Sequence, residues 1–235
     1  MPELNLIDST IPPSLDVLFE DNHLIAVNKP PGEAVQKDKS GDQPLSERVR
    51  AFLKSAYGKP GRVYLGIAHR LDRPTSGAIV FARTSKALSR LNQSFREGEV
   101  NKRYWAVVCN PPPESEGELV NYLVRDRRRN KSFVTDRSSK TQEARLGYRT
   151  LLELDRYTVL DIQLYTGRHH QIRAQLAAIG CYIKGDLKYG APHSNPNGGI
   201  HLHARELGFT HPVRNNGLTI VAEPPTDTLW DMVVG

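Results

Sequence analysis

Five segments of the chain have the short apolar or alternating runs that are typical of β-strands. They are residues 15–20, 24–28, 78–81, 102–108 and 157–165. β-Branched and aromatic side chains are frequent in them, as expected for residues that pack on a pleated surface. Polar and turn-forming residues separate the first two runs, so we expect short strands joined by turns.

Three other segments repeat their apolar residues at helical spacing: residues 45–53, 87–95 and 171–178. Thr84 is the expected N-cap of the second helix, and Gly98 is its expected C-cap. Helices and strands are mixed along the chain, without the regular alternation of parallel α/β proteins. The sequence therefore predicts an α+β fold with a mainly antiparallel, mixed central sheet flanked by helices and loops.

The chain has 235 residues, of which 38% are hydrophobic, which suits one large core. We therefore expect residues 1–235 to form a single domain. The N-terminus lacks the basic and then apolar pattern of a signal segment, and no run approaches the ~18 apolar residues of a membrane span. Cys109 and Cys181 lack the spacing of a disulfide framework or a zinc site. These features favour a soluble, cytoplasmic protein with reduced thiols, and a monomer is the default expectation.

Charge is unevenly distributed along the chain. The formal net charge is +6, and residues 125–140 carry +5 of it through seven basic and two acidic side chains. The basic ones are Arg125, Arg127, Arg128, Arg129, Lys131, Arg137 and Lys140. Such a concentration favours a polyanionic partner, above all a nucleic acid bound along its phosphates. The alternative is a solvated hairpin whose charge serves solubility.

One carboxylate is distinguished by its neighbours. Asp72 lies between Arg70 and Arg73 in a turn-rich stretch that leads into the apolar run at residues 78–81. Nearby opposite charge favours the ionised form of a carboxylate. An ionised aspartate at the junction of a loop and a strand can act as a nucleophile or as an electrostatic stabiliser. We therefore expect the functional site here.

Several common catalytic motifs are missing from the sequence. It has no phosphate-binding P-loop, no dinucleotide-binding glycine motif, no serine-hydrolase elbow and no zinc-protease motif. The neighbouring pairs His169 with His170, and His201 with His203, raise the question of a metal site. Neither pair has a carboxylate or cysteine at ligand spacing, which favours structural or RNA-facing histidines.

A second informative stretch is residues 165–173, which lead into a predicted helix and are followed by the lysine-containing residues 184–190. The stretch places cations and amide or imidazole donors where exposed backbone N–H groups already favour an anion. Arg173 on this helix can reach inward toward a buried carboxylate. The alternative is a basic helix face in solvent.

Several motifs together resemble the RluA-type RNA pseudouridine synthases. They are NKPPG at residues 28–32, HRLDRPTSG at 69–77, KRYWAVV at 102–108 and TGRHHQIR at 166–173, with further matches at 201–204 and 209–212. Their order and separation match as well, and the resemblance spans a core of about residues 15–225. It implies a central, largely antiparallel mixed sheet flanked by helices, with the active site in a basic cleft across it. Many relatives carry an N-terminal S4-type RNA-binding domain; we expect none here, so target selection would fall to the catalytic domain and its loops.

The resemblance implies roles for individual residues. Asp72 matches the catalytic aspartate, and Tyr104 matches the tyrosine that packs on the uracil ring and takes its C5 proton. Arg173 matches the basic residue that pairs with the aspartate, and Arg70 an arginine that occupies the space left by the displaced base. We expect RNA contacts from His69, Arg70, Arg73, Arg127, Arg128, Arg129, Lys131 and Arg168.

The function implied by the resemblance is the isomerisation of specific uridines in tRNA or rRNA to pseudouridine. The N-glycosidic bond breaks, uracil rotates while bound, and C5 joins C1′, with Asp72 as the nucleophile at C1′ or at C6. The target base must first leave its stack, and contacts with Tyr104 and Arg70 offset that cost. Nothing is oxidised and no phosphate is transferred, so we expect no cofactor, no metal and no nucleotide.

Two other functions stay open at this point. One is an RNA-binding or RNA-chaperone protein without essential catalysis. The other is an N-glycoside hydrolase that uses Asp72. Such a hydrolase needs a second carboxylate as general acid, and the motif stretches show no convincing partner.

Overall fold

The computed structural model describes residues 15–38 and 40–235. Its strands are β1 (Val17–Glu20), β2 (Leu24–Lys29), β3 (Gly66–Ile67), β4 (Ser76–Ala82), β5 (Asn101–Val108), β6 (Glu116–Asp126), β7 (Lys131–Thr135), β8 (Gln142–Glu153), β9 (Thr158–Leu164), β10 (Leu202–Thr210) and β11 (Gly217–Val221). Its helices are α1 (Leu45–Ala56), α2 (Ser85–Glu97), α3 (Gln171–Ala178) and α4 (Thr228–Val234), with a 3₁₀ turn η1 (Leu187–Tyr189). Among the described residues, no helix has the length and apolar character that crossing a membrane requires.

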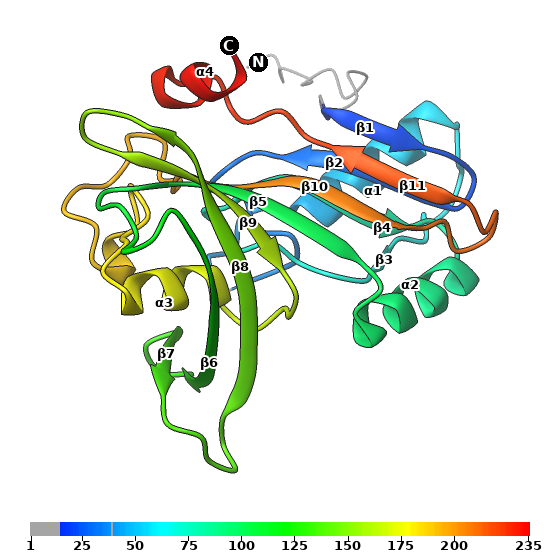
Figure 1. Ribbon diagram of the computed structural model, residues 1–235. Coiled ribbons are helices and arrows are strands. Elements are labelled where there is room, and N and C mark those ends of the chain that lie inside the picture. Colours follow the sequence, from blue (N-terminus) through cyan, green and yellow to red (C-terminus); the bar gives the residue numbers. More distant parts are fainter. Residues whose placement is uncertain (1–14, 39) are drawn as a thin grey trace, which may run out of the picture.

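The described strands form one sheet with the order β1-β2-β4-β10-β5-β9-β8-β6-β7, to which β3 adds beside β4 and β11 beside β10. Every pairing of these named strands is antiparallel except that of β4 with β10. Figure 1 shows the sheet running from β1 at one end to β6 and β7 at the other. The predicted α+β fold with a mainly antiparallel mixed sheet is therefore confirmed.

Two helices cover opposite faces of the sheet at the β1 end. Leu24 of β2 lies in the core under α2 with Leu91, whereas the next residue, Ile25, lies in the core under α1 with Leu53. A strand that is buried on both faces requires an unbroken apolar run rather than alternation. The run at residues 24–27 has this character, which is why its sequence signal is strong.

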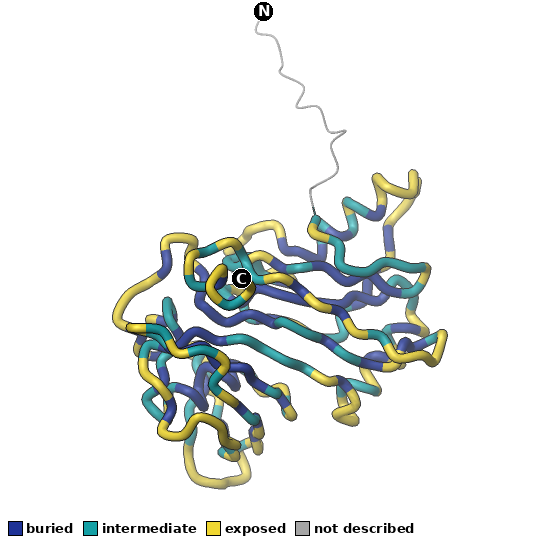
Figure 2. Tube along the Cα trace, turned by 45° about the horizontal axis from the view of Figure 1, so that its top comes forward, coloured by how far each residue is buried: buried dark blue, intermediate teal, exposed yellow. Residues whose placement is uncertain are grey.

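β8 shows the contrasting, one-sided pattern. Ala144, Leu146 and Tyr148 are buried, and the residues between them are exposed or half-buried. α3 covers the inward face, with Ile172 and Leu176 in the same core as Leu146. Figure 2 shows this change from the buried central strands to the exposed outer ones. The packing of α3 on this half of the sheet fixes where its polar side chains point.

The predicted ends of α2 are confirmed. Thr84 Oγ1 accepts a hydrogen bond from the Ala87 N–H at 3.2 Å, and Gly98 ends the helix in the left-handed conformation at φ +77°. α3 begins differently, because His170 before its first residue has φ +54°. That backbone conformation is uncommon for a residue other than glycine.

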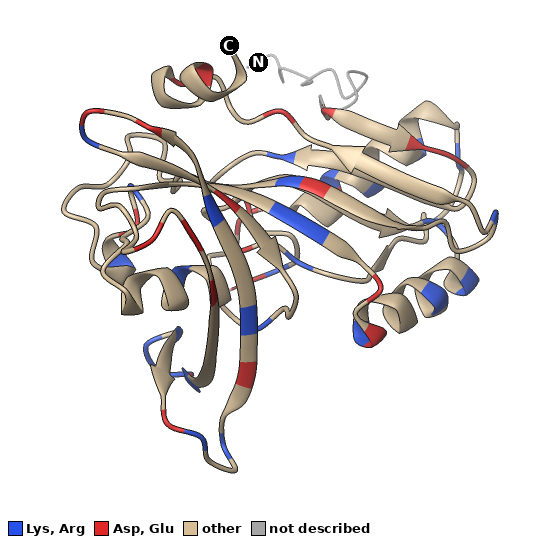
Figure 3. Ribbon diagram, viewed as in Figure 1, with Lys and Arg blue, Asp and Glu red and all other residues tan. Residues whose placement is uncertain are grey.

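β6, β7 and β8 extend past the rest of the sheet as an antiparallel ribbon (Figure 1). The basic run at residues 125–140 occupies the β6–β7 turn, β7 and the connection to β8, where Figure 3 shows Lys and Arg gathered. Asp126 Oδ1 accepts hydrogen bonds from the N–H groups of Arg128 at 2.8 Å and Arg129 at 3.1 Å. Asp126 therefore shapes the turn that presents these arginines to solvent.

The close approach of β4 to β10 requires a glycine. Gly77 pairs with Ala204 and has φ +116°, and a Cβ at this position would lie 2.3 Å from the Ala204 carbonyl oxygen. A larger residue would force the two strands apart. The pairing brings the loop before β4, which carries Asp72, close to β10 and its neighbour β5.

Candidate active site

The loop between β3 and β4 carries Asp72, and its backbone is held on both sides. Leu71 is buried in the core under α1. The carbonyl oxygen of Arg73 accepts hydrogen bonds from the Gly32 N–H at 2.9 Å and from Lys29 Nζ at 3.0 Å. The Asp72 side chain between these anchors stays 27% exposed, so it is accessible to a bound molecule.

Lys29 is a buried lysine whose contacts the sequence did not reveal. Its Nζ donates to the carbonyl oxygens of Pro30 and Glu33, both at 2.8 Å, and of Arg73 at 3.0 Å. Burial lowers the pKa of Lys29 to about 7. The three hydrogen bonds tie the turn after β2 to the Asp72 loop, so Lys29 supports the site from inside.

Arg173 connects Asp72 to a second carboxylate that lies far away in the sequence. Its Nη1 donates to Asp72 Oδ2 at 3.0 Å, and its Nε and Nη2 donate to the two oxygens of Asp186 at 2.6 and 2.8 Å. The side chains of Arg173 and Asp186 are only 5% and 1% exposed. Burial opposes the charge of Arg173, but the hydrogen bonds and charges of both carboxylates outweigh it and raise its pKa. Arg173 is therefore a permanent cation beside Asp72.

Two aromatic side chains complete the surroundings of this ion pair. The guanidinium Cζ of Arg173 lies 5.0 Å from the ring centroid of Tyr189. His170 Nε2 lies 3.6 Å from Asp72 Oδ2. Burial lowers the pKa of His170 to about 3, so its imidazole is neutral. No motif in the sequence pointed to Tyr189 or Asp186 individually, although both lie in the lysine-containing stretch at residues 184–190.

Tyr104 lies in the middle of the sheet, near the ion pair. On β5 it pairs with Ala204 of β10 and Ile162 of β9. Its side chain packs against both the core under α1 and the core under α3. Burial and the charge of Asp72 raise the pKa of Tyr104 well above its usual value. The hydroxyl therefore keeps its proton and feels the charge of Asp72.

Comparison with known proteins identifies the family. A sequence model described as RNA pseudouridylate synthase matches residues 23–178, a range that contains Asp72, Tyr104 and Arg173. The chain belongs to the RNA pseudouridine synthase family.

Relatives and a solved structure agree with this assignment. A ribosomal large subunit pseudouridine synthase D from Zymomonas mobilis is 33% identical and aligns over 91% of this chain and 70% of its own. A tRNA pseudouridine synthase C from Vibrio parahaemolyticus is 30% identical, with 94% of each chain aligned. The structure of human RNA pseudouridylate synthase domain containing 4 has a TM-score of 0.75 and 26% identity over 93% of this chain and 91% of that one. The resemblance seen in the motifs is confirmed, and the protein is an RNA pseudouridine synthase, an isomerase.

Most of the cations that were expected to bind RNA lie at the surface of the synthase. Arg70 has no hydrogen-bond or ion-pair partner among the described residues, and Arg168 donates its Nε to the Glu143 carbonyl oxygen at 2.8 Å. Lys131 is half-buried, with its Nζ 4.7 Å from the Tyr189 ring centroid. The exposed members of the set are Arg70, Arg73, Arg127, Arg128, Arg129 and Arg168.

Lys102 is a further cation, which was not among the RNA contacts expected from the sequence. It is half-buried and lies two residues before Tyr104 on β5, so the two side chains share one face of the strand. No ion-pair partner for it occurs in the described part of the chain. Burial and the charge of Arg168 lower the pKa of Lys102. Lys102 and Arg168 are therefore neighbouring cations, and no carboxylate of the described residues lies between them to neutralise their charges.

His69, which was expected to contact RNA, makes structural contacts inside the protein. Its ring stacks on Phe95 of α2 with 4.6 Å between centroids, and its Nε2 accepts a hydrogen bond from the Val80 N–H at 3.1 Å. Burial lowers the pKa of His69 to about 3. A neutral ring held in this way braces β4 against α2, and the sequence could not show that it points inward.

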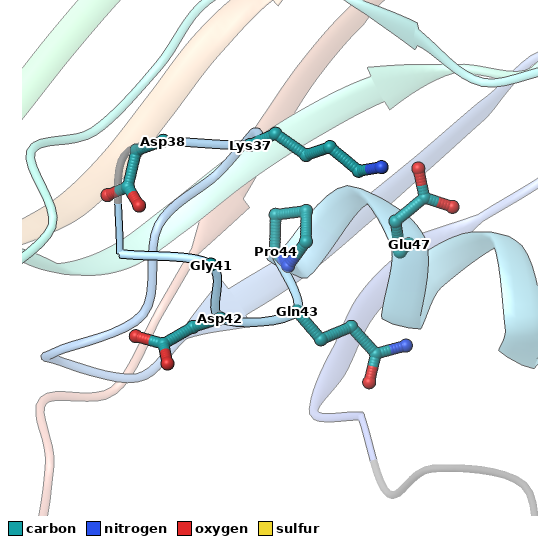
Figure 4. Close-up of a pocket in the computed structure, with 7 residues that line it drawn as sticks. All are labelled: Lys37, Asp38, Gly41, Asp42, Gln43, Pro44 and Glu47. Carbon is teal, nitrogen blue, oxygen red and sulfur yellow. The ribbon is translucent and has the colours of Figure 1, made fainter.

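The side chain of Arg73, which was expected to contact RNA beside Asp72, makes contacts within the protein instead. Its guanidinium pairs with Asp42 and, at 3.6 Å, with Asp38, and its Nε donates to the Gly32 carbonyl oxygen at 2.8 Å. Figure 4 shows the two carboxylates on the loop before α1. The hollow there, of about 580 Å³, is lined by three carboxylates and one lysine, a charge that repels phosphate. Arg73 thus ties two loops together, and Arg173 supplies the positive charge at Asp72.

The remaining histidine pair is taken up by structural contacts. His203 Nδ1 lies 2.9 Å from Ser76 Oγ, and its Nε2 lies 3.0 Å from the Ala222 carbonyl oxygen. The ring of His201 stacks on Trp230 with 5.4 Å between centroids. Over residues 15–38 and 40–235, no three potential metal ligands come together.

The neutral histidines predict an acid-sensitive fold. Burial lowers the pKa of His69 and His170 to about 3 and that of His203 to about 4, from 6.5. Between these values the unfolded chain binds protons that the native side chains do not, so the free energy of unfolding falls as the pH falls below about 6.5. We expect each of these three histidines to lower the free energy of unfolding by about 2 kcal/mol when the pH falls from about 7 to about 5.

Urea unfolding at the two pH values measures this loss. His69→Gln keeps an acceptor for the Val80 N–H and should reduce the pH dependence by the share of one histidine. Equal urea midpoints for the unmodified synthase at both pH values would contradict the prediction.

Proposed function

We propose that this synthase isomerises uridine in tRNA or rRNA, with Asp72 as the nucleophile and the target base flipped out of its helix. The observation that carries the proposal is the bridge by Arg173: a buried, permanently charged arginine holds one oxygen of a partly exposed carboxylate. The names of two relatives, one for the large ribosomal subunit and one for tRNA, support both RNA classes as substrates.

Asp72 provides the electrons for the first step. One of its oxygens attacks an electron-poor carbon, either C1′ of the ribose or C6 of the uracil. In attack at C1′, the O–C1′ bond forms while the C1′–N1 bond breaks, and the electron pair leaves on uracil. After uracil has turned, C5 bonds to C1′, and the carboxylate departs with the electron pair of the O–C1′ bond. Arg173 stabilises the departing carboxylate because it stays charged.

The final step removes the proton from C5, and Tyr104 receives it. Because burial and the charge of Asp72 raise the pKa of Tyr104, the phenol starts neutral. Its oxygen can accept a proton only as its own proton leaves. The Asp72 carboxylate, which the preceding step has released, takes that proton and later gives it to solvent. One proton thus passes from C5 to Tyr104 and one from Tyr104 to Asp72. N1 of the rearranged uracil, whose bond to C1′ was broken, takes a proton from solvent in place of the one that Asp72 releases, so the product is an isomer of uridine.

RNA binding is assigned to the exposed cations. Arg70 is free to enter the space left by the displaced base, which offsets part of the cost of unstacking. Lys102 lies on the Tyr104 face of β5 and has Arg168 nearby, so the two cations can bind the phosphates beside a flipped uridine. The arginines of the β6–β7 turn extend this track, with phosphate contacts that add affinity without reading the bases.

Asp186 argues against the hydrolase alternative. An N-glycoside hydrolase needs a second carboxylic acid to protonate the leaving group. Asp186 is the carboxylate that shares Arg173 with Asp72, but both of its oxygens accept hydrogen bonds from Arg173 and its side chain is 1% exposed. Asp186 is therefore buried against Arg173 and is not placed to reach a leaving group.

Other expectations stay predictions. They are that residues 1–235 form one catalytic domain with its core at about residues 15–225, and that the enzyme works as a monomer in the cytoplasm. The reaction as written also calls for no cofactor, metal or nucleotide.

Replacing the nucleophile tests the proposal. Asp72→Asn keeps the size of the side chain but removes its charge, so release of tritium from RNA labelled at uracil C5 should fall about a thousandfold or more. RNA affinity should change little, because phosphate contacts supply most of it. Unmodified tRNA and rRNA transcripts, assayed separately, identify the substrate class.

The matched control is Asp155→Asn, in the exposed turn between β8 and β9, which should keep full activity. Unchanged tritium release by the Asp72→Asn protein would refute the assignment of Asp72. Free uracil among the products would indicate a hydrolase, and RNA binding without either product would indicate a binding protein.

The basic ribbon predicts a strong salt dependence of RNA binding. Replacing Arg127, Arg128 and Arg129 by Gln removes three phosphate contacts. The slope of log affinity against log salt should become shallower by about two units between ~50 and ~200 mM KCl. Fluorescence anisotropy with labelled RNA measures this slope.

A matched triple substitution of Lys54, Lys59 and Arg62 by Gln, at the α1 end of the molecule, should leave the slope unchanged. The same slope for the arginine variant and the unmodified synthase would show that the ribbon does not bind RNA.

A further inference from the structure

The two oxygens of Asp72 have different surroundings. Oδ2 lies 3.0 Å from Arg173 Nη1 and 3.6 Å from His170 Nε2. Oδ1 has no hydrogen-bond partner in the part of the chain that the structure describes. Because both neighbours converge on Oδ2, Oδ1 is the oxygen left to attack. What His170 contributes depends on which ring nitrogen carries its proton.

The hydroxyl of Tyr189 helps to determine which ring nitrogen of His170 carries the proton. It accepts a hydrogen bond from the Ser132 N–H at 2.8 Å, it is placed to donate to the Ser132 carbonyl oxygen at 3.1 Å, and it lies 3.0 Å from His170 Nδ1. A phenol has one proton to donate. If that proton goes to Ser132, His170 donates from Nδ1 and turns a lone pair on Nε2 toward Asp72. If it goes to His170 Nδ1, the N–H of Nε2 faces Asp72.

Electrostatics favours the second arrangement. A lone pair facing a carboxylate is repelled, whereas an N–H is attracted, and the effect is larger in a buried site. The ring of His170 is neutral, since burial lowers its pKa to about 3, so it donates without carrying a charge. The distance of 3.6 Å to Asp72 Oδ2 is long for a hydrogen bond. Such contacts commonly tighten when substrate is bound.

The ring of His170 is held from its other side as well. His169 stacks on it with 3.8 Å between centroids. His169 is itself held by Ser132 Oγ at 2.9 Å and Asn130 Oδ1 at 3.2 Å. The left-handed backbone of His170, at φ +54°, is a strained conformation that persists where its surroundings over-determine it. These contacts fix the imidazole in one orientation toward Asp72.

We propose that His170, with its proton placed by Tyr189, is a neutral donor that holds Asp72 Oδ2 and so turns Oδ1 toward the nucleotide. His170 acts through Asp72 and is a positioning residue rather than a catalytic one. The proposal rests on the proposed function, in which Asp72 is the nucleophile.

Two substitutions at His170 separate the donor from the ring. The amide nitrogen of Gln extends to about the place of Nε2 and can still donate to Asp72, whereas that of Asn ends near Nδ1. Asn also tolerates the left-handed backbone. We expect His170→Asn to lower the single-turnover rate about ten- to a hundredfold with little change in KM, and His170→Gln to stay within about threefold of the unmodified rate. Equal rates for the two variants, or a change confined to KM, would overturn the proposal.

The position of the proton can be read directly. In the nuclear magnetic resonance spectrum of protein labelled with ¹⁵N-histidine, the His170 signals are those lost in His170→Gln, and we expect a protonated Nε2 and a bare Nδ1. Tyr189→Phe should shift the proton toward Nδ1 and slow the reaction, whereas Tyr157→Phe, the matched control, should do neither. A proton on Nδ1 in the unmodified synthase would refute the proposal.

Asp72→Asn shows where a failure would lie. If this variant is inactive while His170→Asn is fully active, the role of His170 is wrong and the proposed function stands. If Asp72→Asn is active, the proposed function is wrong, and with it the role given to His170.

Discussion

A buried arginine is tolerated only when its charge is neutralised, and Arg173 meets this requirement with two carboxylates from distant parts of the chain. Asp186 occupies Nε and Nη2, which leaves Nη1 for Asp72. Removing Asp186 would leave the buried guanidinium with one partly exposed partner, so the ion pair with Asp186 fixes Arg173 and, through Nη1, the position of Asp72. The nucleophile is thus held before any RNA arrives, and its orientation adds little to the barrier of the reaction.

The ion pair also joins the two halves of the sheet. Asp72 belongs to the β2–β4 half through Leu71 and the bonds of Lys29, whereas Arg173 belongs to α3, which packs on the β8 half. Tyr104, on the central strand β5, packs against both cores. The site therefore lies where the halves meet, within reach of the basic ribbon. RNA held along the ribbon would be led toward it.

Local patterns predicted the fold better than the site. Strands buried on both faces and the capped α2 have strong signals, whereas β6, β7 and β8 carry many charges among their apolar residues and escaped notice. Closeness in sequence was a poor guide to the neighbours of Asp72. The side chain of Arg73 pairs with Asp38 and Asp42, and that of His69 packs inward against β4. The motifs led to Arg173, but no spacing rule links it to Asp186, because only the folded chain brings them together.

The geometry of Arg173, and not its charge alone, is what we propose makes Asp72 reactive. Arg173→Lys tests it most directly, because one ammonium keeps the charge but cannot serve both carboxylates with the fork of a guanidinium. The measurement is the single-turnover rate of tritium release from labelled RNA. The matched control is Arg149→Lys, because Arg149 also pairs with an aspartate, Asp161, but lies outside the site. We expect Arg173→Lys to bind RNA normally and to react about a hundredfold more slowly or worse, while the control reacts normally. A rate within about threefold of the unmodified synthase would contradict this proposal.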